Sequence, residues 1–375
     1  MISIERGMFN YANVFKNVFS FTPDLDSQRL RYNMVNLKRL AQELNLSIAT
    51  ISRALQDSHE VSAETKEKVW ALAKQLNYVP NPYASSLRRQ KSKTIGVVIP
   101  EIANNFFTLA INGIEEAAQT KGYHVLIYLT HDNMQKEISI MQHLQSGRVD
   151  GILMSVSSET NSCDHIVELK NKKIPIVFFD RVCEEISDTA RVTTDDYESG
   201  YKATEHLIEC GCKKIAYLHV SQNLSIGKKR MEGYLKALEK YNINHHQDLV
   251  IYGSNNDEDN YGKIKKLLSK KNRPDGIFAS VENLAIATYY VCNDLNLSIP
   301  DDVKIISFSN LATAPLLCPS LTTITQPAFN IGKEAASILL QKLKKNNYVY
   351  DNNVVLNSTL VIRNSTRKTP LPVRT

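Results

Sequence analysis

The pattern of apolar and polar positions changes character at about residue 94. Between residues 36 and 77 apolar side chains recur every three or four positions, which predicts three short helices. The first of these helices places one apolar face at Leu37, Leu40, Ala41 and Leu44. After residue 94, short runs rich in Val and Ile alternate with helical stretches. That alternation predicts an α/β fold of doubly wound parallel sheets with helices on both faces.

The α/β part of the chain repeats its own pattern. Four apolar runs of the first half are "TIGVVIP", "YHVLIYLT", "VDGILMS" and "IPIVFFD", and those of the second half are "KKIAYLHV", "DLVIYGS", "DGIFAS" and "VKIISFS". Two similar halves predict two lobes with a cleft between them, and ligands of such sheets bind at the carboxyl ends of the strands. The predicted helices lie at 105–121, 133–146, 162–172, 197–211, 226–241, 257–270 and 282–296.

These patterns divide the chain into parts. The tail contains "LTTITQP", a helix to about Lys345 and "VVLNSTLVIRNST", and we expect it to cross back and complete both lobes. The predicted parts are a disordered extension at 1–33, an all-α module at 34–79, a linker at 80–93, and an α/β domain at 94–370, with an N-lobe of about 94–191 and 322–353 and a C-lobe of about 192–321 and 354–366.

The positive charge is concentrated near the N-terminus. The whole chain has a formal net charge of +6. Residues 34–93 contain 10 basic and 5 acidic residues, whereas residues 94–375 contain 31 of each. A small basic module on a neutral large domain indicates a polyanion as partner of the small module. A basic surface that only improves solubility is the alternative, and charge alone does not decide between them.

Several function classes are disfavoured by what the sequence lacks. No run approaches the ~18 apolar residues of a membrane span, and a start that carries Glu5 and Arg6 is a poor secretory signal. The six cysteines are scattered and form no metal-binding spacing, which predicts unpaired thiols in a reducing cytoplasm and no metal site. Phosphate-loop, Gly-x-Ser-x-Gly and HExxH motifs are missing, so we expect neither an enzyme nor a cofactor.

The stretch "NLSIATISRALQ" at residues 45–56 predicts a short helix with two different sides. At 100° per residue, Ile51, Ala54 and Leu55 point toward the module. The opposite side carries small and polar residues around one arginine, a composition that suits a helix lying in a DNA groove, because Arg, Gln and Ser can hydrogen-bond base edges. An ordinary solvated face is the alternative, and the neighbouring helices and basic charge favour the groove. The outward residues are Ala49, Ser52, Arg53 and Gln56, with Ile48 and Thr50 at the edges.

The chain resembles the lactose/galactose-repressor (LacI/GalR) family of bacterial transcription regulators. The resemblance rests on "VNLKRLAQELNLSIATISRALQ", "VSAETKEKVWALAKQLNYVPNPYASSLRR" and "TIGVVIPEIANNFF", followed in order by "GRVDGILMS", "PIVFFDR", "GCKKIAYL", "RMEGYLKAL" and "PSLTTITQP". It extends from about Val35 to about Ser365. It implies a helix-turn-helix DNA-binding module, a hinge helix in the linker, and a two-lobed domain like the periplasmic binding proteins.

The resemblance assigns roles to residues of the module and linker. Residues 48–56 would be the recognition helix in the major groove. Ser47, Thr50 and Ser52 match phosphate or base contacts, Ile48 and Ala49 match the pair that sets half-site preference, and Arg53 matches a base-reading position. In the linker, Asn81 can cap the hinge helix and is predicted, like Leu87, to contact DNA, and Leu87 matches a wedge that opens a base step from the minor groove. A helix-packing role is the alternative for Leu87.

The resemblance also places an effector site in the cleft. Phe106 and Phe107 match positions that line the ligand, Asp180 and Arg181 end the strand "IPIVFFD", and Arg230 matches a ligand-binding arginine. An aspartate and two arginines beside aromatic rings suit a polyol or sugar, because the carboxylate and guanidinium groups bind hydroxyls and the rings cover apolar faces. For each residue alone, a structural salt bridge or a core aromatic is an equal alternative.

Three positions of the cleft depart from well-known members of the family. Ser309 stands where many relatives carry an aspartate, Asn255 stands where some carry an aromatic ring, and Glu282 replaces a shorter polar residue. The effector of a relative therefore does not transfer to this chain.

Taken together, the sequence predicts a cytoplasmic, nucleoid-associated, homodimeric regulator, expected to be a repressor. It would bind a near-palindromic double-stranded DNA operator under the control of a small molecule, expected to be a carbohydrate. A solute-binding protein and a sugar-acting enzyme are the alternatives, since both use two-lobed folds. The poor secretory signal and the basic module disfavour the first, and the lack of a catalytic set disfavours the second.

Overall fold

The computed structural model describes residues 36–78, 92–219, 223–254, 256–344 and 352–367. The chain forms two compact units, Met1–Ala84 and Ser85–Thr375. The predicted extension at 1–33 and almost all of the predicted linker at 80–93 lie outside the described residues.

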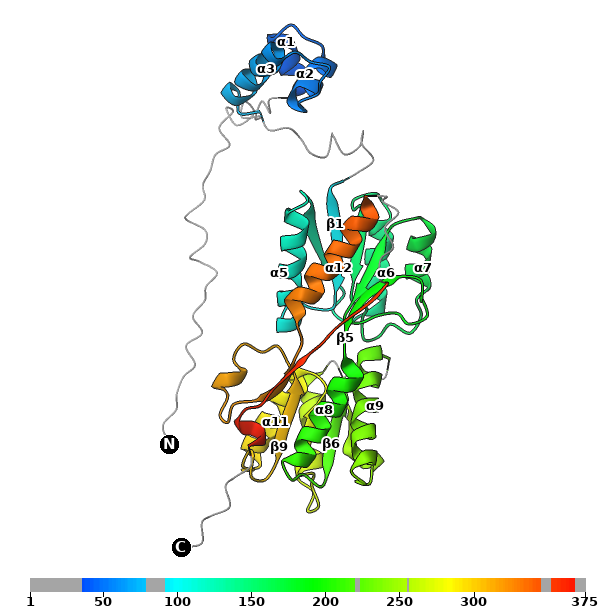
Figure 1. The fold of residues 1–375 in the computed structure, drawn as a ribbon, viewed down its shortest axis with the longest axis vertical. Helices are drawn as coiled ribbons and strands as arrows, with labels where there is room; N and C mark the ends of the chain where they lie inside the picture. The colour runs from blue at the N-terminus through cyan, green and yellow to red at the C-terminus, as the bar shows by residue number, and fades with distance from the viewer. Residues whose placement is uncertain (1–35, 79–91, 220–222, 255, 345–351, 368–375) are drawn as a thin grey trace, which may run out of the picture. The chain divides into compact units, whose positions relative to one another are not determined.

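Three helices form the first unit: α1 (Leu37–Glu43), α2 (Ile48–Leu55) and α3 (Ala63–Gln75) (Figure 1). Each helix begins with a polar cap whose side-chain oxygen accepts a backbone N–H of the first turn. The caps are Asn36, Ser47 and Ser62.

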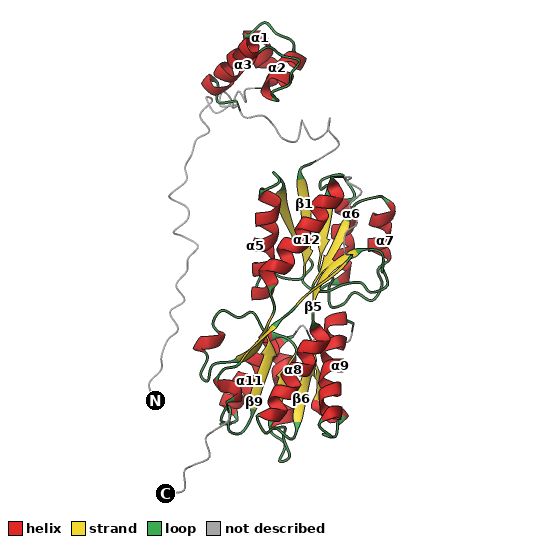
Figure 2. Cartoon of the chain, viewed as in Figure 1, coloured by secondary structure: helices red, strands yellow, loops and turns green. Residues whose placement is uncertain are grey.

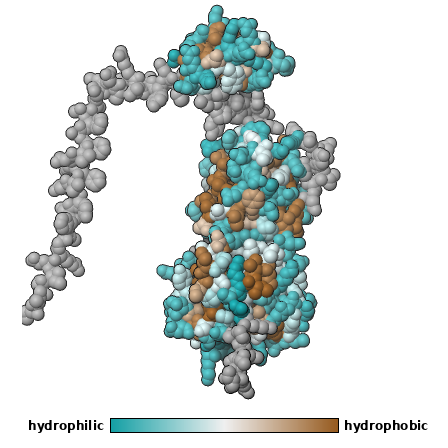
Figure 3. All heavy atoms as spheres, turned by 60° about the vertical axis from the view of Figure 1, so that its left-hand side comes forward, coloured by the Kyte–Doolittle hydropathy of each residue, from teal (hydrophilic) through white to brown (hydrophobic). Residues whose placement is uncertain are grey.

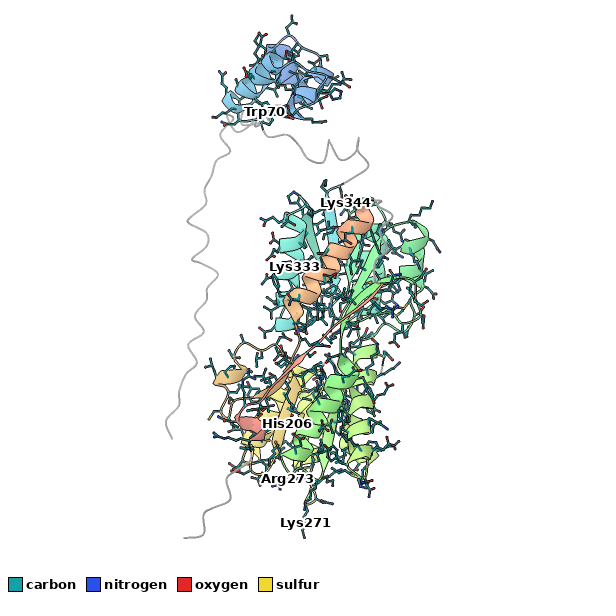
Figure 4. The ribbon with its side chains drawn as sticks, in the orientation of Figure 1. Trp70, His206, Lys271, Arg273, Lys333 and Lys344 are labelled. Atoms are coloured by element: carbon teal, nitrogen blue, oxygen red, sulfur yellow. A yellow bond between two sulfur atoms is a disulfide. The ribbon has the colours of Figure 1, made fainter. Side chains whose placement is uncertain are left out.

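The three helices share one small core. Buried apolar side chains from α1, α2 and α3 form a single cluster made of Leu40, Ala41, Ile51, Ala54, Val69 and Ala73. Leu37, Leu44 and Leu55 pack partly buried at its edge. Trp70, the single tryptophan of the chain, remains 49% exposed on α3 (Figure 4).

The N-lobe of the second unit is a six-stranded sheet in the order β11-β5-β4-β3-β1-β2, with all strands parallel. Its apolar side chains alternate between two faces: Ile95 and Val97 of β1 pack with α5 and α12, whereas Val98 packs with α6 and α7. The elements are β1 (Thr94–Ile99), α5 (Asn105–Gln119), β2 (His124–Leu129), α6 (Met134–Leu144), β3 (Gly151–Met154), α7 (Asp164–Asn171), β4 (Ile176–Phe179), β5 (Ala190–Thr194), α12 (Ala328–Leu343) and β11 (Asn353–Leu356).

The C-lobe repeats this architecture with the order β12-β10-β9-β8-β6-β7, in which only β12 is antiparallel. Helices α8 and α9 cover one face of the sheet, and α10 and α11 cover the other (Figure 2). The elements are α8 (Asp196–Glu209), β6 (Ile215–His219), α9 (Ser225–Lys240), β7 (Val250–Tyr252), α10 (Asp257–Leu268), β8 (Gly276–Ala279), α11 (Glu282–Asp294), β9 (Lys304–Phe308), β10 (Thr322–Thr325) and β12 (Thr359–Val361), with short 3-10 turns at Gln247–Leu249, Ala314–Leu316 and Asn364–Thr366.

The predicted fold class is confirmed, but the predicted limits of the lobes are wrong at three places. β10 pairs with β9, so residues 322–325 belong to the C-lobe, although the prediction assigned them to the N-lobe. β11 pairs with β5, so residues 353–356 belong to the N-lobe. The chain also crosses to the C-lobe only after β5, a strand that the sequence analysis did not predict and that extends to Thr194. Strand partners far apart in the sequence decide these limits, and local periodicity does not reveal such partners.

The prediction that all cysteines are unpaired is also wrong. Cys163 at the start of α7 and Cys183 after β4 form a disulfide, with Cα atoms 6.5 Å apart. β3 and β4 are neighbouring strands, so the segments that follow them lie side by side and bring the two sulfur atoms together. Cys210, Cys212, Cys292 and Cys318 are not part of a disulfide among the described residues.

Within the described residues, no helix is long and apolar enough to cross a membrane.

Two glycines allow α5 and α12, the first and last helices of the N-lobe, to pack closely. A Cβ atom on Gly113 of α5 would lie 2.0 Å from the carbonyl oxygen of Phe329, and one on Gly332 of α12 would lie 1.9 Å from that of Ala110. Such contacts are sterically forbidden, so the backbones of α5 and α12 can touch only because these side chains are missing. Lys333 of α12 then reaches Glu116 of α5 at 2.8 Å (Figure 4).

Gly332→Ala should therefore destabilise the α/β unit. The added methyl group must push α5 and α12 apart, which we expect to cost on the order of 1–3 kcal/mol, measured by thermal or urea unfolding. Gly262→Ala in α10 is the matched control, because a Cβ there meets nothing within 4 Å. This control should gain about 0.5–1 kcal/mol from helix propensity. Equal stability of the two variants would contradict the close-packing argument.

Candidate functional site

The outer side of α2 exposes a small set of side chains of mixed chemistry. Ile48 is 44% exposed, and Ala49, Arg53 and Gln56 are also exposed. The opposite side is fixed to the module, since Ile51 and Ala54 have no exposed surface. The predicted division of α2 into an inward and an outward side is therefore present for these residues.

Ser52 is an exception, and its predicted outward position is wrong. Its exposed fraction is only 9%, and its hydroxyl accepts a hydrogen bond from the Gln56 side-chain amide at 3.3 Å. A serine is small enough to be covered by neighbouring helices, which an angular projection of one helix cannot detect. Ser52 thus positions Gln56.

The N-terminus of α2 carries exposed hydroxyl groups. Ser47 Oγ accepts the Thr50 backbone N–H at 3.0 Å and lies 2.8 Å from Thr50 Oγ1. The first backbone N–H groups of a helix and the positive end of its dipole favour anions. The residues that were matched to phosphate contacts thus sit where a phosphate would be attracted.

Arg53 is held on the surface by an ion pair. Its Nε lies 3.0 Å from Glu60 Oε2, and both side chains are more than half exposed. Exposed pairs of this kind contribute little stability, so a stronger partner can replace Glu60. Asn81 and Leu87, the other predicted DNA contacts, lie outside the described residues.

The second site lies between the two lobes, where strands of both sheets end. Seven of the eight predicted effector residues line one inner pocket of about 30 Å³. Asn255 lies outside the described residues. The seven are Phe106, Phe107, Asp180, Arg181, Arg230, Glu282 and Ser309.

Arg230 is the most deeply buried charged group of the pocket. Its Nε is 2.7 Å from Asp196 Oδ1, and both side chains are 2% exposed. Its Nη1 donates to the carbonyl oxygen of Ser280 at 2.6 Å, and the guanidinium lies 3.7 Å from the ring centre of Phe308. Nη2 is buried and has no hydrogen-bond partner among the described residues. A buried donor without a partner is costly, so Nη2 is available to an acceptor on a ligand.

Asp180 is a buried carboxyl group held in an unusual backbone conformation. It follows β4 with a φ of 60°, in the left-handed region that non-glycine residues seldom adopt. Burial raises its pKa to about 6, and the nearby charges of Arg181 and Arg230 only partly oppose that shift. The group therefore changes protonation close to neutral pH.

Arg181 connects the inner pocket to a larger outer chamber. Its Nη1 lies 2.6 Å from Asp132 Oδ1, and its guanidinium is 5.6 Å from the ring centre of Phe107. The outer chamber has a volume of about 280 Å³ and shares Asn104, Arg181 and Val281 with the inner pocket. Glu101 lines this chamber, and partial burial raises its pKa. The two spaces are therefore adjacent.

Glu282 and Ser309, which depart from the familiar pattern, are hydrogen-bonded to each other. Ser309 Oγ donates to Glu282 Oε2 at 2.9 Å, and both side chains are buried. Glu282 Oε1 accepts from the backbone N–H of Asn105 at 3.4 Å, across the cleft. Glu282, in the first turn of α11, thus places a carboxylate beside Ser309, at a position where many relatives carry an aspartate instead of the serine.

Sequence reasoning missed several residues of the cleft. Phe308 and Asp196 hold Arg230, and Asp132 holds Arg181. Gln326 lines the inner pocket and donates to Thr194 Oγ1 at 3.1 Å where the chain crosses between lobes. Phe308 and Asp132 each lie at or just beyond the carboxyl end of a strand, the one sequence signal that could have identified them.

Two family models match the chain, one for each unit. The model described as bacterial regulatory proteins of the lacI family matches residues 36–81. The model described as periplasmic binding proteins and sugar binding domain of the LacI family matches residues 92–362.

Individual relatives agree with both models. Catabolite control protein A of Priestia megaterium is 28% identical over 312 residues, spanning 83% of this chain and 93% of that protein. A LacI-family transcriptional regulator from Enterococcus faecium, solved with bound ribose, is 28% identical with a TM-score of 0.64, covering 74% of this chain and 100% of that one. The lac repressor dimer bound to operator has the same fold, with a TM-score of 0.77 at 22% identity, covering 88% of this chain and 99% of that one. The helix-turn-helix unit and the two-lobed unit thus identify this chain as a member of the LacI family, a DNA-binding transcriptional regulator with an effector-binding domain.

Proposed function

We propose that α2 reads operator bases through Ile48, Ala49, Arg53 and Gln56, with Ser52 positioning Gln56. Ser47 and Thr50 contact phosphate at the start of the helix. Support comes from the exposure of Ile48, Ala49, Arg53 and Gln56 on a helix whose opposite side buries Ile51 and Ala54. Asn81 and Leu87 remain proposed hinge contacts.

A carbohydrate or another small polyol is the proposed effector. One observation carries this proposal: the unpaired Arg230 Nη2 lies in a pocket that also presents two carboxyl groups and the rings of Phe106, Phe107 and Phe308. Guanidinium and carboxylate groups form paired hydrogen bonds with hydroxyl groups, and aromatic rings cover the apolar faces of a sugar. The ribose bound by the Enterococcus faecium relative belongs to this chemical class.

The size of the cleft indicates that the lobes must separate for binding. The inner pocket has room for about one water molecule, whereas the outer chamber of about 280 Å³ is close to the lower limit of ligand pockets. A small ligand would therefore enter the outer chamber and reach Arg230 when the lobes rotate apart. We propose that this movement changes the spacing of the paired linkers and thereby the affinity for the operator.

A second copy of this chain is the proposed partner of the N-lobe edge. β2 is the edge strand, and its neighbouring residues Leu126 and Ile127 are 43% and 40% exposed. Apolar areas are visible on the surface of the α/β unit in Figure 3. Homodimerisation would cover this edge and place two recognition helices on a near-palindromic operator.

The proposed regulator is not an enzyme and acts in the cytoplasm at the nucleoid. The relatives named above are regulators.

Arg53→Ala should weaken binding to the preferred operator by about 1–3 kcal/mol and relax the base preference at one position of each half-site. The measurement is selection from random DNA, followed by titration of the selected duplex at fixed salt. Glu60→Ala is the control, because it breaks the same ion pair but keeps the guanidinium. If Glu60→Ala reproduced the effect, or if Arg53→Ala kept the base preference, Arg53 would not read a base.

A thermal-shift screen of sugars, sugar phosphates and nucleosides tests the effector proposal, because a ligand that binds only the folded protein raises Tm. For a sugar identified in this way, Glu282→Gln should weaken binding roughly tenfold or more by removing a charge-assisted acceptor. Glu239→Gln on the exposed surface of α9 should leave the Kd unchanged. A screen in which nucleosides bind and sugars do not would refute the carbohydrate assignment.

Asp180→Asn should change how stability depends on pH. A carboxyl group whose pKa is raised by folding stabilises the protein below its unfolded pKa of 3.8, and that contribution is lost as pH rises through about 6. At pH 7 the variant should therefore be more stable than the wild type, by on the order of 2 kcal/mol. Asparagine also tolerates the left-handed backbone.

Urea unfolding between pH 4 and pH 8 measures this effect. Asp188→Asn in the same loop is the control, because Asp188 is exposed and its pKa is lowered by its hydrogen bond to Lys170. Loss of that exposed pair should change the stability only slightly, and it should lower the stability at pH 7 rather than raise it. Parallel pH profiles for the wild type and Asp180→Asn would contradict the burial of an ionisable group at this position.

A further inference from the structure

The disulfide between Cys163 and Cys183 lies beside the cleft. Cys183 is three residues beyond Asp180, in the loop that follows β4, and Cys163 is the N-cap of α7. Both residues are buried, with exposed fractions of 4% and 8%. The bond therefore ties the segment that carries Asp180 and Arg181 to the segment that follows β3.

Residues of the C-lobe pack against this disulfide. Leu224 and Ile226, at the start of α9, belong to the same buried apolar cluster as the two cysteines. Two polar contacts cross between the lobes nearby: Asn223 Nδ2 donates to the carbonyl oxygen of Ser158 at 3.4 Å, and Lys229 Nζ lies 3.4 Å from Glu184 Oε1. Glu184 is the residue next to Cys183, so a change at the disulfide is transmitted directly to an ion pair between the lobes.

A separate cavity gives small molecules a place beside the sulfur atoms. It measures about 330 Å³ and is lined by both cysteines, by Glu184 and Glu185 of the N-lobe, and by Asn223 and Lys228 of the C-lobe. This cavity shares no lining residue with the inner pocket or the outer chamber of the effector cleft. A thiol or disulfide of low molecular weight can occupy it.

We propose that Cys163 and Cys183 form a reversible thiol–disulfide modification site that sets how firmly the N-lobe loop 180–189 is held against the C-lobe. The oxidant is a low-molecular-weight disulfide such as oxidised glutathione. One cysteine thiolate attacks it and releases one glutathione thiol, leaving a mixed disulfide. The second cysteine thiolate attacks the protein sulfur of that mixed disulfide, and the second glutathione leaves. Two protein thiols thus lose two electrons and two protons, and one glutathione disulfide becomes two thiols.

Cys163 is the residue placed to attack first. It precedes the first turn of α7, where the positive end of the helix dipole stabilises a thiolate, and Lys228 lines the same cavity. The proposal does not depend on the operator or the effector proposed above.

The test follows the thiols of the full-length chain across a series of ratios of reduced to oxidised glutathione. After denaturation and alkylation, intact mass should show four labelled cysteines in the oxidised protein and six in the reduced protein, since the four other cysteines are not part of a disulfide. The conversion should occur within the range of ratios found in cells. Tm should fall by about 5 °C or more on reduction, because the bond closes a loop between positions 20 residues apart.

Variants separate this site from the other cysteines. Cys163→Ser/Cys183→Ser should show four labelled cysteines at every ratio and a Tm that no longer responds to glutathione. Cys318→Ser, which removes an exposed free cysteine, should keep the two-thiol conversion and the Tm shift. Hydrogen exchange in residues 181–189 should be faster in the reduced wild type than in the oxidised form.

Three results would overturn the proposal. The first is six labelled cysteines at every ratio, meaning that the bond does not form. The second is a bond that persists in excess reduced glutathione, meaning a permanent crosslink. The third is protection of both thiols by added Zn²⁺ at every ratio, since the two sulfur atoms and the Glu185 carboxylate lie within 4.8 Å of one another and could hold a metal ion instead.

Discussion

The buried ion pair between Arg230 and Asp196 is the interaction on which the effector cleft depends. Removing two charges from water costs several kcal/mol for each ion, and only close geometry with further hydrogen bonds offsets that cost. The geometry is provided by helices α8 and α9, whose backbones touch because Gly200 has no side chain: a Cβ there would lie 2.4 Å from the Arg230 carbonyl oxygen. Asp196 begins α8 directly after the chain enters the C-lobe. The pair therefore fixes the lobe crossing, the helix packing and the ligand-facing arginine together.

This arrangement gives the cleft a rigid donor. Arg230 is fixed on one edge by Asp196, on another by the carbonyl oxygen of Ser280, and on its face by the ring of Phe308. Only Nη2 remains without a partner. A ligand that accepts from Nη2 loses little entropy to ordering the protein, because the guanidinium is already ordered. The proposed ligand contact would thus use the same side chain as the salt bridge, so these two alternatives for Arg230 do not exclude each other.

Much of the fold could be predicted from the sequence because its signals are local. Apolar runs mark the strands of both sheets except β5, and helical periodicity marks the helices between them. The limits of the lobes could not be predicted, because they depend on which strands pair with β10 and β11. The same reason applies to the site. Asp180 and Ser309, at strand ends, were predicted to line the cleft. Phe308, Asp132 and Gln326 also lie at or just after strand ends but were not predicted, because a strand end does not reveal which side chains face the cleft. The burial of Ser52 and the pairing of Cys163 depend on contacts with distant parts of the chain.

Several polar contacts that join the two lobes are long, and this bears on how a ligand can control the protein. Three polar contacts between described residues, from Glu282 to Asn105, Asn223 to Ser158 and Lys229 to Glu184, each measure 3.4 Å. Hydrogen bonds of this length are near the limit of useful geometry, so these contacts provide little energy to hold the lobes together. A ligand that adds two or three charge-assisted hydrogen bonds in one lobe arrangement, each worth about 1.5–3 kcal/mol, can therefore shift the balance between arrangements. The sign of regulation follows from which arrangement gives Arg230 Nη2 its acceptor.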